Sequence, residues 1–355
     1  MRQAWKYALA GLVGLLIGLS FASCGQQKGE SFEPEDPLNF KFVEGKRTSQ
    51  NRLLELQING VILNSPSGGI SELTGGEVTY GYQIERLLER ISEDKRVKGI
   101  FLRLSTPGGT VVGSDAIYNA LVNYRKSTKQ PVVGYVEGLS ASGGVMSMVG
   151  ADVIYAAPGS SIGSIGVIGA ALTYYDEPVA VDGGLLGQGI TTRKGIQRTV
   201  ISAGRGKDLG NPFRKPTEEE LRVLRQGVNN EYNNFVNRVA RARNISEKQI
   251  RDQMGAMIFD NKTAQEFKLI DGTRSRDEAI ADLAKRAKVG DDYQVVQVSR
   301  QRGLLAGLLG NQLTVTQKEQ EQKTIARDLC TATTHAVLVY YGTVARLCPS
   351  ELISQ

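Results

Sequence analysis

The chain has 355 residues, 41% hydrophobic and 23% charged, a globular composition that suffices for one large core or two modest ones. It carries 43 basic and 37 acidic residues, for a net charge of +6, without a basic run interleaved with aromatic residues. The sequence therefore does not predict a nucleic-acid surface. The single histidine, His335, lies far along the chain from every segment with catalytic character. This argues against a Ser-His-Asp triad and against a zinc site, and we expect no metal or other cofactor.

The first 24 residues have the pattern of an export segment. Arg2 and Lys6 form a positive n-region, and the uncharged, largely apolar run Tyr7–Phe21 follows. This run is short for a membrane-spanning helix, which needs about 20 residues. The tetrapeptide Phe-Ala-Ser-Cys ending at Cys24 resembles a lipoprotein cleavage box, so Cys24 is a lipidation candidate; an uncleaved anchor and simple secretion are the alternatives. In the first two cases the folded part is tethered to the outer face of the cytoplasmic membrane.

Strand and helix patterns begin after a polar segment, residues 25–50, which contains Pro34 and Pro37 and predicts a flexible linker. The predicted order is strand 54–58, helix 84–91, strand 97–104, helix 114–125, strand 132–136 and strand 153–157. This succession predicts a largely parallel, layered α/β fold for a catalytic domain over residues 51–290. In such sheets function gathers in loops beyond the carboxyl ends of the strands.

The second half of the chain reads mainly as helices. Thr217 with Glu220 makes a capping box, and apolar residues spaced three and four apart predict a long helix after it. Shorter helical patterns follow at 246–254, 263–267 and 277–287. Residues 291–355 form a C-terminal extension of unknown role with one strand-like run, at 295–298. Cys330 and Cys348 lie in this extension and, in an exported protein, are either a disulfide or two separate buried thiols.

Two glycine-rich segments after predicted strands carry backbone groups suited to acyl chemistry. Pro107-Gly108-Gly109 offers N–H groups that no side chain obstructs. Ser142 stands at a strand-to-helix turn, next to Gly143, where the first helical N–H groups are unpaired. Those groups either bind the serine as a helix cap or stabilise an oxyanion beside a serine nucleophile.

A serine nucleophile here would need a base other than histidine, and lysine is the usual substitute. Lys207 lies in the glycine-rich loop 203–208, and spacing alone leaves Lys194 and Lys215 as alternatives. A lysine can act as a base only where its surroundings favour the neutral amine.

The motifs occur in the order found in the bacterial signal peptide peptidase A family. They are Ser-Thr-Pro-Gly-Gly at 105–109, Ala-Ser-Gly-Gly at 141–144, Ile-Gly-Ser-Ile-Gly-Val at 162–167, Gly-Lys-Asp at 206–208, and Ile-Phe-Asp-Asn to Leu-Ile-Asp at 258–271. Together they cover roughly residues 52–285. Each motif occurs once, so the chain resembles the single-domain form of the family. Val145 departs from it, since an aromatic residue commonly follows Ser-Gly-Gly.

This resemblance implies a membrane-associated serine endopeptidase with a Ser/Lys dyad on the Clp-protease/crotonase-like fold of repeated β-β-α units. Its substrates would be remnant signal peptides or other hydrophobic membrane-derived peptides. The chain would form a homo-oligomeric ring, in which the serine and lysine of one site can come from neighbouring subunits. By motif, the implied roles are Ser142 as nucleophile, Lys207 as general base, Gly109 or Gly108 with Gly143 as the oxyanion hole, and Ser164 as the residue positioning the lysine.

Two other classes share parts of this pattern. A crotonase-type acyl-CoA enzyme has the same oxyanion geometry, but it works through acidic residues and has no reason to be exported. An inactive ring scaffold would not need both Ser142 and Lys207. We therefore expect a peptidase.

Overall fold

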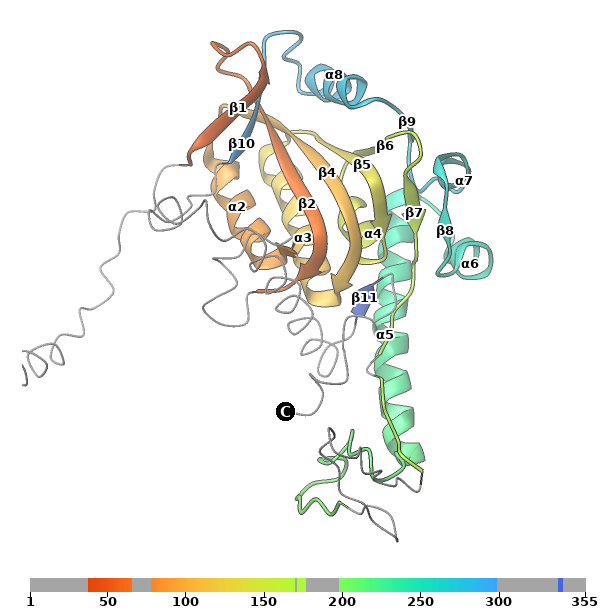
Figure 1. The fold of residues 1–355 in the computed structure, drawn as a ribbon. Coiled ribbons are helices and arrows are strands. Elements are labelled where there is room, and N and C mark those ends of the chain that lie inside the picture. Colours follow the sequence, from red (N-terminus) through yellow and green to blue (C-terminus); the bar gives the residue numbers. More distant parts are fainter. Residues whose placement is uncertain (1–37, 66–77, 170, 177–197, 299–337, 341–355) are drawn as a thin grey trace, which may run out of the picture. The chain divides into compact units, whose positions relative to one another are not determined.

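The computed structural model describes residues 38–65, 78–169, 171–176, 198–298 and 338–340 (Figure 1). The described elements belong to the unit Phe40–Gln355, which separates from Met1–Asn39. Several residues discussed above lie outside the described residues: Cys24 and the export segment, Lys194, Cys330, His335 and Cys348.

The main sheet follows the order β1-β10-β2-β4-β5-β6-β9 (Figure 1). Its strands are β1 (Phe40–Gly45), β10 (Gln294–Val298), β2 (Arg52–Leu63), β4 (Val97–Thr110), β5 (Val132–Ala141), β6 (Val153–Ala156) and β9 (Gly272–Thr273). Neighbours along this path are parallel, except that β1 runs antiparallel to β10. The predicted α/β fold with a largely parallel sheet is confirmed.

Short strands extend the sheet where the long ones turn away. The strand β3 (Val78–Tyr80) pairs with the end of β2. The strand β7 (Ser161–Gly163) pairs with the end of β5 and, on its other side, with β8 (Ile258–Phe259). The strand β11 (Leu338–Tyr340) pairs antiparallel with the end of β4.

Helices cover both faces of the sheet, which explains why its central strands are apolar on both sides. The helix α8 (Arg276–Arg286) packs on alternate strand residues such as Leu53, Phe101 and Val133. On the other face lie α2 (Gly81–Glu93), α3 (Val111–Thr128) and α4 (Gly143–Met148) (Figure 1).

The long helix α5 (Glu218–Arg243) begins at the predicted capping box, where the Thr217 side chain accepts from the Glu220 backbone. Its buried side chains, Phe235, Val236 and Val239, all lie in its C-terminal half. The first half of α5 therefore extends away from the core of its own chain. After α6 (Glu247–Gln249), a π-helix spans Ile250–Met254 and α7 (Asn261–Glu266) follows.

Three predicted boundaries need correction. The strand β1 lies within the predicted linker 25–50, and β10 lies beyond the predicted domain end at 290, yet the two pair at one end of the sheet. Residues Pro107–Gly109 are part of β4 instead of a loop after it. Register shifts between Asn59 and Val61, and between Leu104 and Thr106, let the strand continue through this proline and these glycines.

A buried carboxylate joins several strands to α8. Glu55 on β2 has a side chain only 1% exposed. It accepts hydrogen bonds from Arg276 (2.7 Å), Arg103 (3.0 Å) and Gln297 (2.9 Å), on α8, β4 and β10. Burial by itself raises the pKa of Glu55, but these bonds, with one from Gln57, outweigh it and lower the pKa to about 2.

We expect Glu55→Gln to lower the free energy of unfolding by about 3 kcal/mol at pH 7, since Glu55 is buried and the half-buried Arg103 and Arg276 then lose a charged partner. Because the folded-state pKa lies below the ordinary value, this stabilisation is present above about pH 4.5 and is lost as the pH falls towards 2. Urea unfolding at several pH values measures it. Glu137→Gln is the matched control, because Glu137 also binds Arg103 but is 45% exposed, and it should cost under about 1 kcal/mol. Equal losses would contradict the role of Glu55.

Candidate active site

Ser142 stands in a strained turn between β5 and α4. Its backbone has φ 55° and ψ −111°, a region that residues with a Cβ rarely adopt. The turn is held by the Ser142 N–H, which donates to the Gly163 carbonyl at 2.8 Å. Within the described residues its side chain makes no capping bond and contacts only the Gly166 carbonyl, at 3.5 Å. The geometry thus favours the nucleophile over the helix cap, because strain at such a turn is a mark of functional residues.

The neighbouring serines have structural partners. The Ser147 hydroxyl donates to the Gly143 carbonyl at 2.8 Å, and the Ser140 hydroxyl contacts the Met148 sulfur at 3.4 Å. Both serines are fully buried. Their hydroxyls are therefore used by packing, and Ser142 is distinct among the three.

Glycine at 144 allows this turn to press against β4. A Cβ on Gly144 would come within 2.7 Å of the Thr106 methyl carbon and 3.0 Å of the Ser140 hydroxyl. Glycine at 144 is thus required by close packing, as at other strand-to-helix nucleophile turns.

The strand β4 brings one predicted oxyanion donor to the same place. Gly108 and Gly109 lie opposite Val61 and Ile62 of β2, and a Cβ on Gly109 would fall 1.8 Å from the Ile62 carbonyl. The Gly108 N–H donates to the Thr106 hydroxyl at 3.0 Å, and that hydroxyl donates to the Gly60 carbonyl. Because the Gly108 amide is engaged, Gly109 is the better candidate of the two. Sequence reasoning missed Thr106, since nothing in the motif reveals its internal hydrogen bond.

Ser164 lies directly after β7, next to the residue that anchors Ser142. It is 6% exposed and has φ 59°, and its N–H donates to the Met257 carbonyl at 2.7 Å. The structure thus brings Ser142, Gly109, Gly143 and Ser164 together at the carboxyl ends of β4, β5 and β7. Nothing in the sequence pattern pointed to Met257.

Lys207 is placed elsewhere. It is exposed, in a series of turns between Gly204 and Gly210, and none of its described contacts reaches Ser142. Its loop is fastened to Glu220, near the start of α5, whereas α5 meets the core from Phe235 onward. At 1.5 Å per residue these two points are about 22 Å apart. Among the described residues, Lys207 therefore makes no contact with Ser142. The alternative Lys215 is also exposed and lies over the Tyr174 ring.

An arginine fastens the Lys207 loop to α5. Arg214 donates to Asp208 and to Glu220, with nitrogen–oxygen distances of 2.7 Å in both pairs. The hydrogen bond from Arg214, followed by the Thr217 backbone bond, lowers the pKa of Glu220 to about 2. The same arginine lowers the pKa of Asp208. Both carboxylates are thus ionised at neutral pH, and the loop has a defined connection to the helix.

We expect Arg214→Met to reduce kcat about tenfold with little change in Tm, because it loosens the Lys207 loop without touching the core. Peptidase assays and thermal unfolding measure the two effects. Arg205→Met is the control, since Arg205 pairs with Glu219 on the same helix but is 89% exposed. A large fall in Tm, or equal kcat in the two variants, would count against this role.

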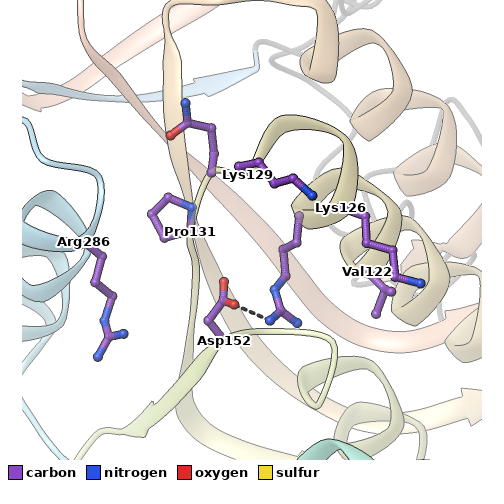
Figure 2. A pocket seen from close by; sticks show the side chains of 8 residues that line it. Val122, Lys126, Lys129, Pro131, Asp152 and Arg286 are labelled. Atoms are coloured by element: carbon purple, nitrogen blue, oxygen red, sulfur yellow. Dashed lines mark hydrogen bonds and ion pairs between the residues drawn. The ribbon is translucent and has the colours of Figure 1, made fainter.

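The pocket drawn in Figure 2 lies at the opposite end of β5. Pro131 and Asp152 line it, just before β5 and β6 begin, together with Lys126, Lys129 and Arg286. Asp152 forms an ion pair with Arg125 of α3. Since Ser142 follows the carboxyl end of β5, this basic pocket is not part of the candidate site.

Among the described residues, no group of three or more His, Cys, Asp and Glu side chains is arranged to hold a metal ion. In the same part of the chain, no helix combines the length and apolar character needed to cross a bilayer.

The chain is similar to several known proteins. The model of Peptidase family S49 matches residues 124–290, a range that includes Ser142, Ser164 and Lys207. An Enterococcus faecium protein named for signal peptide peptidase SppA is 29% identical over 265 residues, 75% of this chain and 72% of that protein. A Methanocaldococcus jannaschii protein named as a protease is 35% identical over 58% of this chain and 61% of its own length. A solved structure of a ClpP1 mutant from Listeria monocytogenes has a TM-score of 0.39 and 14% identity, covering 65% of this chain and 95% of that chain.

These matches define the class of protein: the chain is a serine-type peptidase. Residues 124–290 match the model of Peptidase family S49, and the resemblance to the signal peptide peptidase A family is confirmed.

Proposed function

We propose that this protein is a membrane-associated serine endopeptidase that cuts remnant signal peptides or other hydrophobic membrane-derived peptides, with Ser142 as nucleophile and Lys207 as general base. The observation that carries the proposal is the strained backbone of Ser142, whose hydroxyl is left out of the helix cap. Such strain costs of order 1–3 kcal/mol and persists where the surroundings enforce it.

The reaction follows from the groups around Ser142. Its hydroxyl oxygen attacks the peptide carbonyl carbon, and the lysine amine takes the hydroxyl proton. The N–H groups of Gly109 and Gly143 stabilise the oxyanion that forms. The lysine then protonates the leaving amine, and water attacks the acyl-enzyme in a second round that releases the serine.

The base is proposed to come from a neighbouring subunit of a homo-oligomeric ring. Lys207 is exposed, and its loop is fastened to Glu220, about 22 Å along α5 from Phe235, where the helix meets its own core. Leu221, Leu224 and Val228 follow one face of the first half of α5 and are only partly buried. An apolar face there suits packing against a second copy, which would carry Lys207 towards that copy's Ser142.

Labelling with a fluorophosphonate tests the proposal against its alternatives. The wild-type chain should form a covalent adduct that maps to Ser142 by mass spectrometry, and Ser142→Ala should not. An inactive scaffold would remain unlabelled in both forms. A crotonase-type enzyme would hydrolyse or isomerise acyl-CoA thioesters without cutting peptides.

The membrane tether is proposed to be a lipid on Cys24, with an uncleaved anchor as the alternative. Cys24→Ser should abolish incorporation of labelled fatty acid and release the protein from membranes. Fractionation after growth with a clickable palmitate analogue measures both. Continued membrane attachment of the variant would contradict lipid anchoring and would support an uncleaved helix. Cys330→Ser, which leaves the cleavage box intact, is the control.

A further inference from the structure

Within the described residues, the C-terminal extension returns to the sheet as β11, beside the candidate oxyanion site. Leu338 lies opposite Thr110, Val339 opposite Gly109, and Tyr340 opposite Gly108, in antiparallel register. Figure 1 draws this strand in dark blue near the end of β4 and near α4, with which it is also in contact.

The position of β11 follows from where β5 leaves β4. On one side of β4, Gly108 and Gly109 face β2. On the other side, pairing with β5 ends at Thr106 and Ser140, because the chain turns at Ser142 into α4. This opens one side of β4 at Gly108–Thr110, and β11 fills it. The strand therefore lies between the two backbone segments assigned to the oxyanion site.

A peptide substrate needs the same side of β4. Its scissile carbonyl must reach both Gly109 and Gly143, so its backbone must run in extended form along the open edge next to Ser142. In this arrangement Ser142 is only 1% exposed. A peptide cannot reach the nucleophile in this arrangement unless something first moves.

We propose that β11 occupies the side of β4, at Gly108–Thr110, where a substrate peptide would bind. It thereby competes with peptides and keeps the enzyme in a state of low activity until it is displaced. The proposal rests on the peptidase function argued above. Competition of this kind scales the apparent affinity by the fraction of chains whose edge is open. If that fraction is about one tenth, KM is raised about tenfold, while kcat is unchanged because the same chemistry follows binding.

The test uses Val339→Pro in the full-length chain. Proline has no N–H and is not tolerated within a paired strand, so it should release β11. The KM for a fluorogenic hydrophobic peptide should fall about tenfold, with kcat kept. Gln320→Pro, in the same extension but outside β11, is the control and should match the wild type. Equal KM values for all three proteins would overturn the inhibitory role.

Hydrogen exchange tests the docking independently of catalysis. In the inactive Ser142→Ala chain, amides of 338–340 and of Gly109–Thr110 should be protected, and adding Val339→Pro should remove protection from those amides of Gly109–Thr110 that face β11. Fast exchange at 338–340 before the proline is introduced would overturn the docking. If no variant cuts the peptide, the proposed function fails, while the exchange data still decide whether β11 occupies the edge.

Discussion

Ser142→Ala is expected to lower kcat/KM for peptide hydrolysis by at least about 10⁴-fold, because it removes the proposed nucleophile. Ser140 and Ser147 are buried, and both hydroxyls already have partners. Steady-state kinetics with a fluorogenic peptide measure the loss, and far-UV circular dichroism verifies that the variant is folded.

Ser140→Ala serves as the control and should keep most activity, since its hydroxyl contacts only the Met148 sulfur among its described partners. Ser142→Gly should be as inactive as Ser142→Ala but more stable by about 1 kcal/mol, because glycine adopts φ 55° without strain. A covalent inhibitor found on Ser140 or Ser147, or an active Ser142→Ala chain, would refute the assignment.

Lys207→Ala and Lys207→Arg are both expected to be nearly inactive, with kcat reduced by about 10³-fold or more. Alanine cannot accept the serine proton, and a guanidinium stays protonated across the accessible pH range. Lys207 is exposed and has no described side-chain partner that its loss would break, so Tm should stay within about 1 °C. Lys215→Ala, in the same region of the chain, is the matched control and should retain activity.

Mixing subunits then tests where the base comes from. If each site takes its serine and lysine from different subunits, refolding Ser142→Ala with Lys207→Ala together should restore part of the activity. Mixed rings contain some interfaces where an intact Ser142 meets an intact Lys207. Absence of recovery in oligomers shown by mass spectrometry to be mixed would place the dyad within one chain. An active Lys207→Arg enzyme would remove this lysine from the mechanism.

Much of the central fold could be predicted because its signals are local. The apolar runs that became β2, β4, β5 and β6 and the helices between them were recognisable from periodicity, and Thr217 with Glu220 marked the start of α5. The short strands β1, β7, β9 and β11 carry no such signal, because their pairing partners lie far away in the sequence. Glu55 alternates with apolar residues as a solvent-facing residue would. Its burial is explained only by the hydrogen bonds that it accepts from Arg103 and Arg276, which lie far away in the sequence.

The candidate site could also be predicted in part, because some of its signals are local in the sequence. The motif located Ser142, and the structure adds its strained turn and the neighbours that enforce it. Proline and glycine at 107–109 indicated a loop, whereas register shifts keep them within β4. The choice of Gly109 over Gly108 depends on the Thr106 hydroxyl, which no spacing rule reveals. Lys207 belongs to a motif, but the group that its amine would contact is proposed to lie on a neighbouring subunit, and neither the sequence nor a single chain shows that contact.

If peptides bind along β4 at Gly108–Thr110, where β11 lies, this edge would also determine which proteins can be attacked. An edge that binds through backbone amides and carbonyls accepts a chain only where that chain has its own backbone groups to spare. A helix must unwind before it can bind there. A folded domain has no free backbone groups for this edge while its own sheets and helices remain intact. Discrimination between substrates and other proteins would then depend on whether a chain is folded more than on its residue identity, so folded proteins would be spared without a recognition signal of their own.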